Sequence, residues 1–395
     1  MGWQDKTIFV TGATGFIGGR VCERLVQEKA SRVRALVHTV QRAPRIARLP
    51  IELCVGDLLD RNSLRRAFAD SQIVVHCASG IGRGIVRSTR NLLQAAQAAG
   101  VERFVHISTA AVYGLTPPPG SEIEQAPLRR TGEEYCDNKI RAERVVARFL
   151  RRGVPAVILR PSIVYGPYSA WSTRLIEALR HDLVALIDGG SGACNTTYVD
   201  NLVDAILLAL ENRHSVGETF FITDGERVTW GDFIRAHADM IVPNRKLAEI
   251  SKREVLARYH KQPGVWRSSL REARTLLFSR ELRLLILKIP LCKQLLAPVW
   301  RELESMPPER RRWVRELLRN GSTAPQVSGE TFLPDPVDFA TQTGTVFFDI
   351  GKARRTLGYE PRVCFSQGMK LVEHWLHFAN YLSDTSPISD SSLGD

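Results

Sequence analysis

The sequence predicts an α/β protein, in which a mainly parallel sheet is covered by helices on both faces. Three observations lead to this fold class. Short β-branched, apolar segments alternate with helical patterns over the first 165 residues. The connections between them are short, and a glycine-rich turn directly follows the first apolar segment.

The expected strands share one character, a run rich in Val and Ile with polar or turn residues at its ends, as in strands buried on both faces. They are Thr7–Thr11, Val33–His38, Ile51–Val55, Ile73–Cys77, Arg103–Ser108 and Pro155–Arg160. Helical periodicity predicts three helices, one after Gly18, one before Gly100 and one over Glu133–Arg152. Gly153 and Pro155 end the third.

The remainder of the chain changes character twice. Beyond residue 170 the pattern is mixed, and residues 250–330 are basic and leucine-rich without a strand signal. The expected organisation is a dinucleotide-binding domain over 1–170, a smaller substrate-binding part over 171–249 and 331–382, a basic helical insert over 250–330, and a disordered Ser- and Asp-rich tail over 383–395.

Much of the net charge of +12 comes from one segment. Residues 251–320 hold 17 Lys and Arg against 7 Asp and Glu, a net of +10. This segment is interpreted either as a solvated helical face or lid, or as a contact with an anionic membrane surface. No nucleic-acid partner is expected, because no recognition motif accompanies the charge.

The seven cysteines are scattered and form no C-x-x-C pair, and the nine histidines show no ligand spacing. A metal site is therefore not expected. We expect a reduced cytoplasmic protein, with peripheral membrane attachment through the insert as an alternative, since neither a secretory signal nor an apolar stretch of spanning length is evident.

The turn over residues 11–18 has the chemistry of a phosphate site. Gly12 permits the tight turn, Gly15 lets the backbone approach a pyrophosphate, and Gly18 lets helix and strand pack closely. Free N–H groups and the positive end of the helix dipole would then face the phosphates. The spacing G-x-x-G-x-x-G is one residue wider than the usual dinucleotide-binding fingerprint. The prediction of a dinucleotide site therefore depends on the strand before the turn and the helix after it.

Tyr135 and Lys139 form the second motif. Residues four apart lie on one face of a helix, so the phenol and the ammonium are neighbours. A free tyrosine has a pKa near ~10, and an adjacent positive charge favours the phenolate. The pair is therefore a candidate for proton exchange at a reacting oxygen.

Taken together, the ordered motifs resemble an extended short-chain dehydrogenase/reductase, the NAD(P)-dependent epimerase/dehydratase group. The resemblance covers roughly residues 5–245 and 345–378 and leaves 250–330 without a counterpart. Its motifs are 11–18, Gly56-Asp57-Leu58, Val75-His76-Cys77-Ala78, Ile107 to Gly114, Tyr135-x-x-x-Lys139, Arg160 to Pro167, Tyr198-Val199-Asp200 and Phe348 to Tyr359. It implies a Rossmann-type doubly wound sheet.

The resemblance also implies the roles of individual residues. Thr109, or Ser108 as the fallback, would orient the reacting oxygen, Tyr135 would exchange the proton, and Lys139 would also bind the nicotinamide ribose. The residues expected at the cofactor are Gly12, Thr14, Gly15, Phe16, Ile17, Gly18, His38, Arg42, Asp57, Leu58, Cys77, Ala78, Ser79, Tyr135, Lys139, Pro161, Ser162 and Ile163.

Cofactor choice depends on the end of the second strand. A carboxylate there would bind a ribose 2′-OH and repel a 2′-phosphate. His38, Arg42 and the two further arginines at 45 and 48 stand there instead, with no acid in reach. NADP is favoured, and NAD is the alternative.

Two departures narrow the reaction. Ala110 and Ala111 occupy the positions where the 4,6-dehydratases of the group carry an acidic pair for elimination, so a dehydratase is not expected. Ile163 stands where many sugar-nucleotide epimerases carry Asn. The preferred hypothesis is an oxidoreductase that exchanges hydride with an apolar or lipid-like alcohol or ketone.

Two other hypotheses stay open. One is a nucleotide-sugar epimerase that retains its cofactor and uses the same three residues. The other is a non-catalytic NADP sensor that engages a membrane or partner through 250–330. A homodimer through the helix carrying Tyr135 is implied only by analogy with the family.

Overall fold

The structure is a computed structural model that describes residues 2–382 apart from 31, 69, 81, 83 and 262–331. The chain divides into two compact units. One runs to Ile250 and resumes at Phe332, and the other is Ser251–Thr331. Of the second unit the structure describes Ser251 and helix α8, Lys252–Lys261. The expected insert beyond α8 and the expected tail 383–395 lie outside the described residues.

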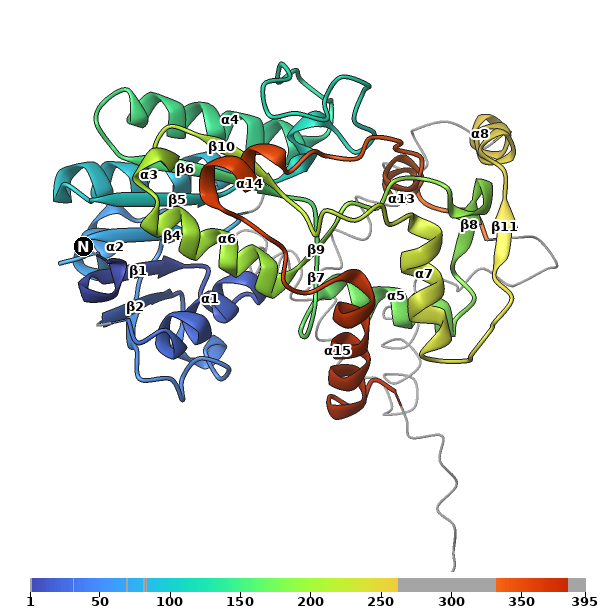
Figure 1. Ribbon diagram of the computed structural model, residues 1–395, viewed down its shortest axis with the longest axis horizontal. Coiled ribbons are helices and arrows are strands. Elements are labelled where there is room, and N and C mark those ends of the chain that lie inside the picture. The colour runs from blue at the N-terminus through green and yellow to red at the C-terminus, as the bar shows by residue number, and fades with distance from the viewer. Residues whose placement is uncertain are drawn as a thin grey trace, which may run out of the picture. The chain divides into compact units, whose positions relative to one another are not determined.

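A seven-stranded parallel sheet organises the first unit (Figure 1). The strand order is β10-β6-β5-β4-β1-β2-β3. The strands are β1 Thr7–Thr11, β2 Arg32–Val37, β3 Glu52–Val55, β4 Ile73–His76, β5 Arg103–Ile107, β6 Ala156–Pro161 and β10 Thr219–Ile222. The expected α/β fold with a Rossmann-type sheet is confirmed, and the six predicted strands agree with β1 to β6 within one residue at each end.

The seventh strand, β10, was not predicted individually. It pairs with β6 at the edge of the sheet although it comes from beyond residue 170. The main sheet therefore includes a strand from the segment expected to form the substrate-binding part. Two small parallel pairs accompany the main sheet, β7 Ile163–Tyr165 with β9 Thr196–Tyr198, and β8 Ala185–Ile187 with β11 Ala248–Ile250. Of these four strands, β8, β9 and β11 come from the same segment, and β7 precedes it.

Ten α-helices of the first unit lie in the described residues. They are α1 Phe16–Gln27, α2 Arg61–Ala67, α3 Gly84–Ala99, α4 Glu134–Leu150, α5 Ala170–Arg180, α6 Val199–Glu211, α7 Trp230–Asp239, α13 Pro336–Gln342, α14 Gly351–Leu357 and α15 Phe365–Phe378. Helix α4 corresponds to the helix predicted over Glu133–Arg152, and α3 begins earlier than the predicted segment.

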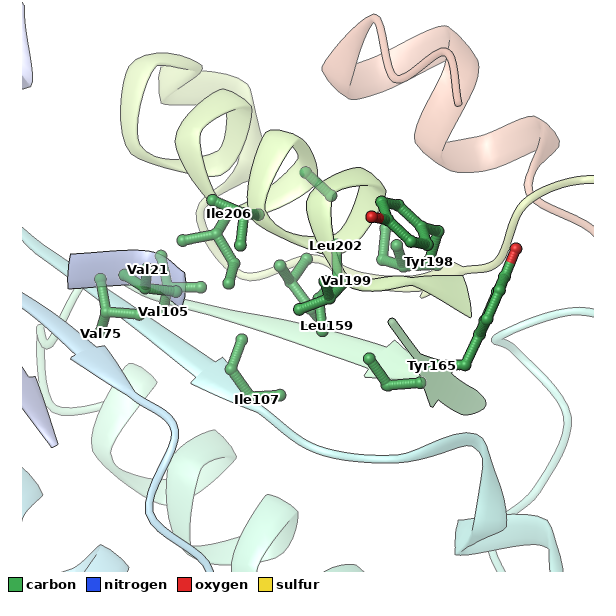
Figure 2. Close-up of a cluster of buried hydrophobic side chains, with 14 of the residues drawn as sticks. Val21, Val75, Val105, Ile107, Leu159, Tyr165, Tyr198, Val199, Leu202 and Ile206 are labelled. Carbon is green, nitrogen blue, oxygen red and sulfur yellow. The ribbon is translucent and has the colours of Figure 1, made fainter. Parts of the chain in front are cut away.

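The pleat of β1 shows how helices cover both faces. Ile8 and Val10 point into a core that includes residues of α1 and α6, whereas Phe9 points into a second core with residues of α2, α3 and α4. Figure 2 shows the first core, where Leu202 and Ile206 of α6 face the sheet. β1 has β2 on one side and β4 on the other, so the strands that follow β3 in the sequence are added on the opposite side of β1 from β2 and β3. Such a switch point opens a crevice at the carboxyl ends of the strands.

Candidate active site

The glycine-rich turn lies at this switch point. Gly12, at φ +71°, follows β1, and a Cβ placed on it would lie 2.7 Å from the backbone nitrogen of Ala78 after β4. The N–H of Cys77 donates to the carbonyl of Thr11 at 3.2 Å, and the N–H of Ala78 donates to the Thr11 hydroxyl at 3.4 Å. The two loops are thus in backbone contact, and only glycine fits at position 12.

The next two glycines bring helix α1 close to the turn. A Cβ on Gly18 would lie 2.2 Å from the carbonyl oxygen of Gly12. Gly15 is the N-cap of α1 and is exposed, with no side-chain cap on the first turn. The neighbouring Thr14 is also exposed, and Phe16 and Ile17 are half-buried. The N–H groups of the first turn have no side-chain cap, so this cradle would fit the pyrophosphate of a dinucleotide.

The loop after β2 carries the residues that bear on cofactor choice. His38, Arg42 and Arg48 are exposed. Arg45 is bound differently: its guanidinium contacts Glu23 of α1 at 2.7 Å and lies 4.3 Å from the ring centre of Tyr168. His38, Arg42 and Arg48 are therefore the basic side chains of this loop that the structure leaves accessible, and His38 and Arg42 lie nearest in sequence to the end of β2.

Asp57 and Leu58 follow β3 and are half-buried. The carboxylate of Asp57 accepts from the N–H of Leu59 at 2.8 Å, and the carbonyl of Leu58 accepts from the Asn91 amide at 2.9 Å. Asn91 is buried in α3 and was not singled out from the sequence. These bonds fix the loop where the resemblance places the adenine.

Lys139 reaches from α4 to the carboxyl end of the sheet. It is only 3% exposed, and its Nζ donates to the carbonyl of Ile107, the last residue of β5, at 3.0 Å. Burial lowers the pKa of Lys139 to about 8, and the Glu143 carboxylate and Cys77 oppose this effect. Burial also raises the pKa of Cys77 to about 12, although Lys139 opposes it. The Lys139 ammonium and Cys77, in the turn after β4, therefore affect each other's pKa.

Tyr135 lies one helical turn before Lys139, at the start of α4. Its side chain is 47% exposed, yet burial raises its pKa, and a hydrogen bond with the Thr109 side chain opposes this shift. The exposed fraction shows that solvent reaches the phenol ring. The expectation that Lys139 lowers the pKa of Tyr135 is not met in this structure. The Lys139 ammonium points instead to the Ile107 carbonyl.

Thr109 completes the group. It follows β5, is buried, and accepts from the N–H of Ala111 at 3.2 Å through its hydroxyl oxygen. Since that oxygen serves as the acceptor, its own proton is available to donate. Ser108, the fallback residue, is bonded elsewhere: its hydroxyl donates to Glu143 at 2.5 Å. The structure thus brings Thr109 and Tyr135 together and assigns Ser108 to another network.

The remaining expected residues lie at the carboxyl ends of β4 and β6. Ser79 is exposed after β4, and Pro161 is buried as the last residue of β6. Ser162 and Ile163 are half-buried; the N–H of Ser162 donates to the Thr197 hydroxyl at 3.4 Å. Because β4, β5 and β6 are neighbours in the sheet, these loops lie at the same edge as Thr109.

Sequence reasoning missed a buried network beneath this site. Glu143 and Arg160 form an ion pair at 2.7 Å, and each side chain is about 5% exposed or less. The position of Glu143, four residues after Lys139, was a usable signal. His76 and His106, on β4 and β5, were also missed; burial lowers the pKa of His76 to about 3 and that of His106 well below its ordinary value.

Among the described residues no cluster of His, Cys, Asp and Glu could hold a metal ion. In the same part of the chain, every helix is too short or too polar to cross a membrane.

Comparisons with known proteins give the site a family. The sequence profile described as "NAD dependent epimerase/dehydratase family" matches residues 8–222. A 4-hydroxy-2-methyl-3-oxo-4-farnesyl-3,4-dihydroquinoline-1-oxide ketoreductase of Stigmatella aurantiaca is 30% identical over 277 residues, 67% of this chain and 82% of the relative. A 2-alkyl-3-oxoalkanoate reductase of Stenotrophomonas maltophilia (strain K279a) is 30% identical over 239 residues, 55% of this chain and 71% of the relative.

Solved structures agree on the fold. The UDP-glucuronic acid 4-epimerase of Bacillus cereus, in complex with UDP-glucuronic acid and NAD, superposes with a TM-score of 0.62 at 19% identity, over 94% of this chain and 99% of that structure. From the profile match, the ketoreductase relative and the shared fold, the chain is an enzyme of the NAD-dependent epimerase/dehydratase family, within the extended short-chain dehydrogenases/reductases.

Proposed function

We propose that this protein is an NADP-dependent reductase that converts an apolar or lipid-like ketone to an alcohol. The single observation that supports this proposal most strongly is the convergence of Thr109, Tyr135 and Lys139 at the carboxyl ends of the strands, next to the turn that holds Gly12. When bound, the nicotinamide supplies the hydride. Side chains of the protein bind the cofactor, orient the substrate and transfer the proton.

Tyr135 and Thr109 would carry out the proton step. Burial raises the pKa of Tyr135, so its phenol is protonated at neutral pH. It is therefore poised to donate a proton to a carbonyl oxygen that gains negative charge. The Thr109 hydroxyl, whose oxygen already accepts from Ala111, donates to the same oxygen and orients it. Both donors would stabilise the negative charge that develops on this oxygen as hydride adds to the carbonyl carbon.

Lys139 serves the cofactor side of the site. One N–H of its ammonium donates to the Ile107 carbonyl, which fixes the direction of the side chain. Two N–H groups remain for hydroxyls of the nicotinamide ribose. The uncapped turn at Gly15 would hold the pyrophosphate, and Asp57 and Leu58 would contact the adenine. Cys77, Ala78 and Ser79 would line one side of the nicotinamide ribose. The loop Pro161–Ile163 would line its other side.

NADP is favoured over NAD by the accessible groups after β2. His38 and Arg42 are exposed there, and no carboxylate stands between residues 37 and 48 to bind a ribose 2′-OH. An arginine suits a 2′-phosphate because its guanidinium binds phosphate oxygens with two parallel N–H groups.

The substrate class rests on Ile163 and on the relatives. An apolar side chain at this edge cannot hydrogen-bond a diphosphate or a sugar hydroxyl. The two reductase relatives are named for ketones that carry farnesyl or alkyl groups. A nucleotide-sugar epimerase is the competing proposal, since the structural neighbour binds UDP-glucuronic acid and NAD. Membrane contact through 250–330 and a homodimer stay predictions from the sequence.

The test measures net redox chemistry. The purified protein is incubated with NADPH and a panel of 2-alkyl-3-oxoalkanoates and aryl ketones, and absorbance is followed at the reduced-nicotinamide band. If the proposal is correct, the amount of NADPH oxidised matches the amount of alcohol formed, and the reaction is faster with NADPH than with NADH. Interconversion of UDP-sugars without net absorbance change, together with tightly retained NAD, would select the epimerase instead.

A further inference from the structure

A buried carboxylate ties three elements together beneath the site. Glu143 of α4 accepts from Arg160 of β6 through both oxygens, Nε to Oε1 at 3.0 Å and Nη2 to Oε2 at 2.7 Å. It also accepts from the Ser108 hydroxyl at 2.5 Å. Both charged side chains are about 4% exposed. A carboxylate so fully bonded holds α4, the loop after β5 and β6 in one arrangement.

This carboxylate lies on the face of α4 that carries the proposed site. Tyr135, Lys139 and Glu143 are spaced by four residues each, so they stack on one side of the helix. Ser108 directly precedes Thr109 in the chain. Glu143 therefore contacts the neighbour of one site residue and lies one turn from another.

Among the described residues, few other charges act on Lys139. The titratable groups that act on it from the packed elements are Glu143 on α4, His76 on β4, Cys77 after β4 and His106 on β5. Burial keeps both imidazoles neutral, and a pKa of about 12 keeps the Cys77 thiol protonated. Of these four groups, Glu143 alone carries a formal charge at neutral pH.

We propose that Glu143 is a positioning residue of this enzyme, which holds Lys139 as an ammonium ion against the effect of its burial and, through Ser108, fixes the loop that carries Thr109. The proposal rests on the proposed function for the role of Lys139 and Thr109. Stability alone does not account for the ion pair, because well-packed apolar residues often replace such pairs without loss of stability.

Two variants separate the electrostatic role from a structural one. Glu143→Gln removes the charge but leaves Arg160 buried without its partner, which destabilises the fold. Glu143→Gln with Arg160→Met removes both charges and spares the fold that penalty. Glu52→Gln is the matched control, because Glu52 pairs with arginines of β2 in the same sheet and is not among the groups that act on Lys139.

The readout is the protonation of Lys139 itself. The protein is labelled with 13C at lysine Cε, the Lys139 signal is assigned by its loss in Lys139→Met, and its chemical shift is titrated between pH 6 and 11. The wild-type midpoint is expected near the pKa of about 8. In Glu143→Gln it falls by at least about one pH unit, the order expected for loss of a unit charge at about 6 Å. In the double variant it also falls, but by less, because the positive charge of Arg160 is removed as well. The control leaves it unchanged.

A second readout follows the cofactor. The affinity for NADPH, measured by its fluorescence, is expected to weaken at pH 8 in the double variant and to recover as the pH falls and Lys139 becomes protonated. A purely structural role predicts equal weakening at every pH. If the double variant does not fold, Glu143→Asp is titrated instead, and a lowered midpoint is expected.

An unchanged Lys139 midpoint in the double variant, or in Glu143→Asp if that is the variant measured, would overturn the proposal. The titration needs neither substrate nor turnover. If the Lys139 midpoint is lowered in the variant but the enzyme reduces no ketone, the result counts against the proposed function and leaves this inference standing.

Discussion

Replacing Lys139 by Met should stabilise the protein at neutral pH. The ammonium is 3% exposed, and its pKa falls from an ordinary value of 10.5 to about 8. At about 1.4 kcal/mol per pH unit, this difference corresponds to about 3 kcal/mol by which burial of the charged form destabilises the fold at pH 7. Met removes that penalty but also the hydrogen bond to Ile107, which is worth about 1 kcal/mol. A net gain of about 2 kcal/mol is expected.

The sign of the pH dependence follows from proton binding. Between pH 8 and 10.5 the unfolded chain holds a proton on Lys139 that the folded chain has lost, so the stability of the wild type rises through this window. The Met variant lacks this rise. Urea unfolding of both proteins at pH 7 and pH 10, followed by tryptophan fluorescence, should show the variant ahead at pH 7 and its lead reduced at pH 10. A variant that is less stable at pH 7, or a difference independent of pH, would refute the reasoning.

Three further predictions concern the cofactor loops and the thiols. Gly18→Ala places a Cβ 2.2 Å from a backbone carbonyl oxygen and should weaken NADPH binding at least about tenfold. Gly84→Ala is the control, because a Cβ there meets nothing within 4 Å and NADPH binding should not weaken. Fluorescence titration checks both variants. Arg42→Asp should lower the preference for NADPH over NADH by about tenfold or more in the same titration, and an unchanged ratio would place the 2′-phosphate elsewhere. Hydrogen bonding lowers the pKa of Cys364, and burial raises that of Cys77 to about 12. Iodoacetamide at pH 7.5 should therefore label Cys364 first by peptide mass spectrometry, and the reverse order would contradict the assigned environments.

Most strands of the sheet could be predicted because they are buried on both faces and rich in apolar residues; β3, in which only Cys54 is buried, is the exception. β1 and β5 are examples, with every residue of β5 buried. β10 was missed as a sheet member because its pairing with β6 depends on a long return of the chain. A run of four residues carries no information about which strand it will join.

The residues of the site could be located from spacing, but their electrostatics could not. An i to i+4 spacing predicts that Tyr135 and Lys139 share a face of α4, and it suggested that the ammonium would lower the pKa of the phenol. The direction of the lysine side chain depends on where β5 ends, and the Ile107 carbonyl accepts its proton. Glu143 follows the same spacing, yet its role depends on Arg160, 17 residues away in the chain.

Substitution of Tyr135 by Phe tests the central claim most directly, because it removes one oxygen atom and keeps the ring. NADPH affinity is measured by fluorescence, and ketone reduction is measured by absorbance, on the same preparation. The account predicts an affinity within about threefold of the wild type and a turnover reduced by about 100-fold or more, the usual contribution of a positioned proton donor. Turnover equal to that of the wild type would contradict it.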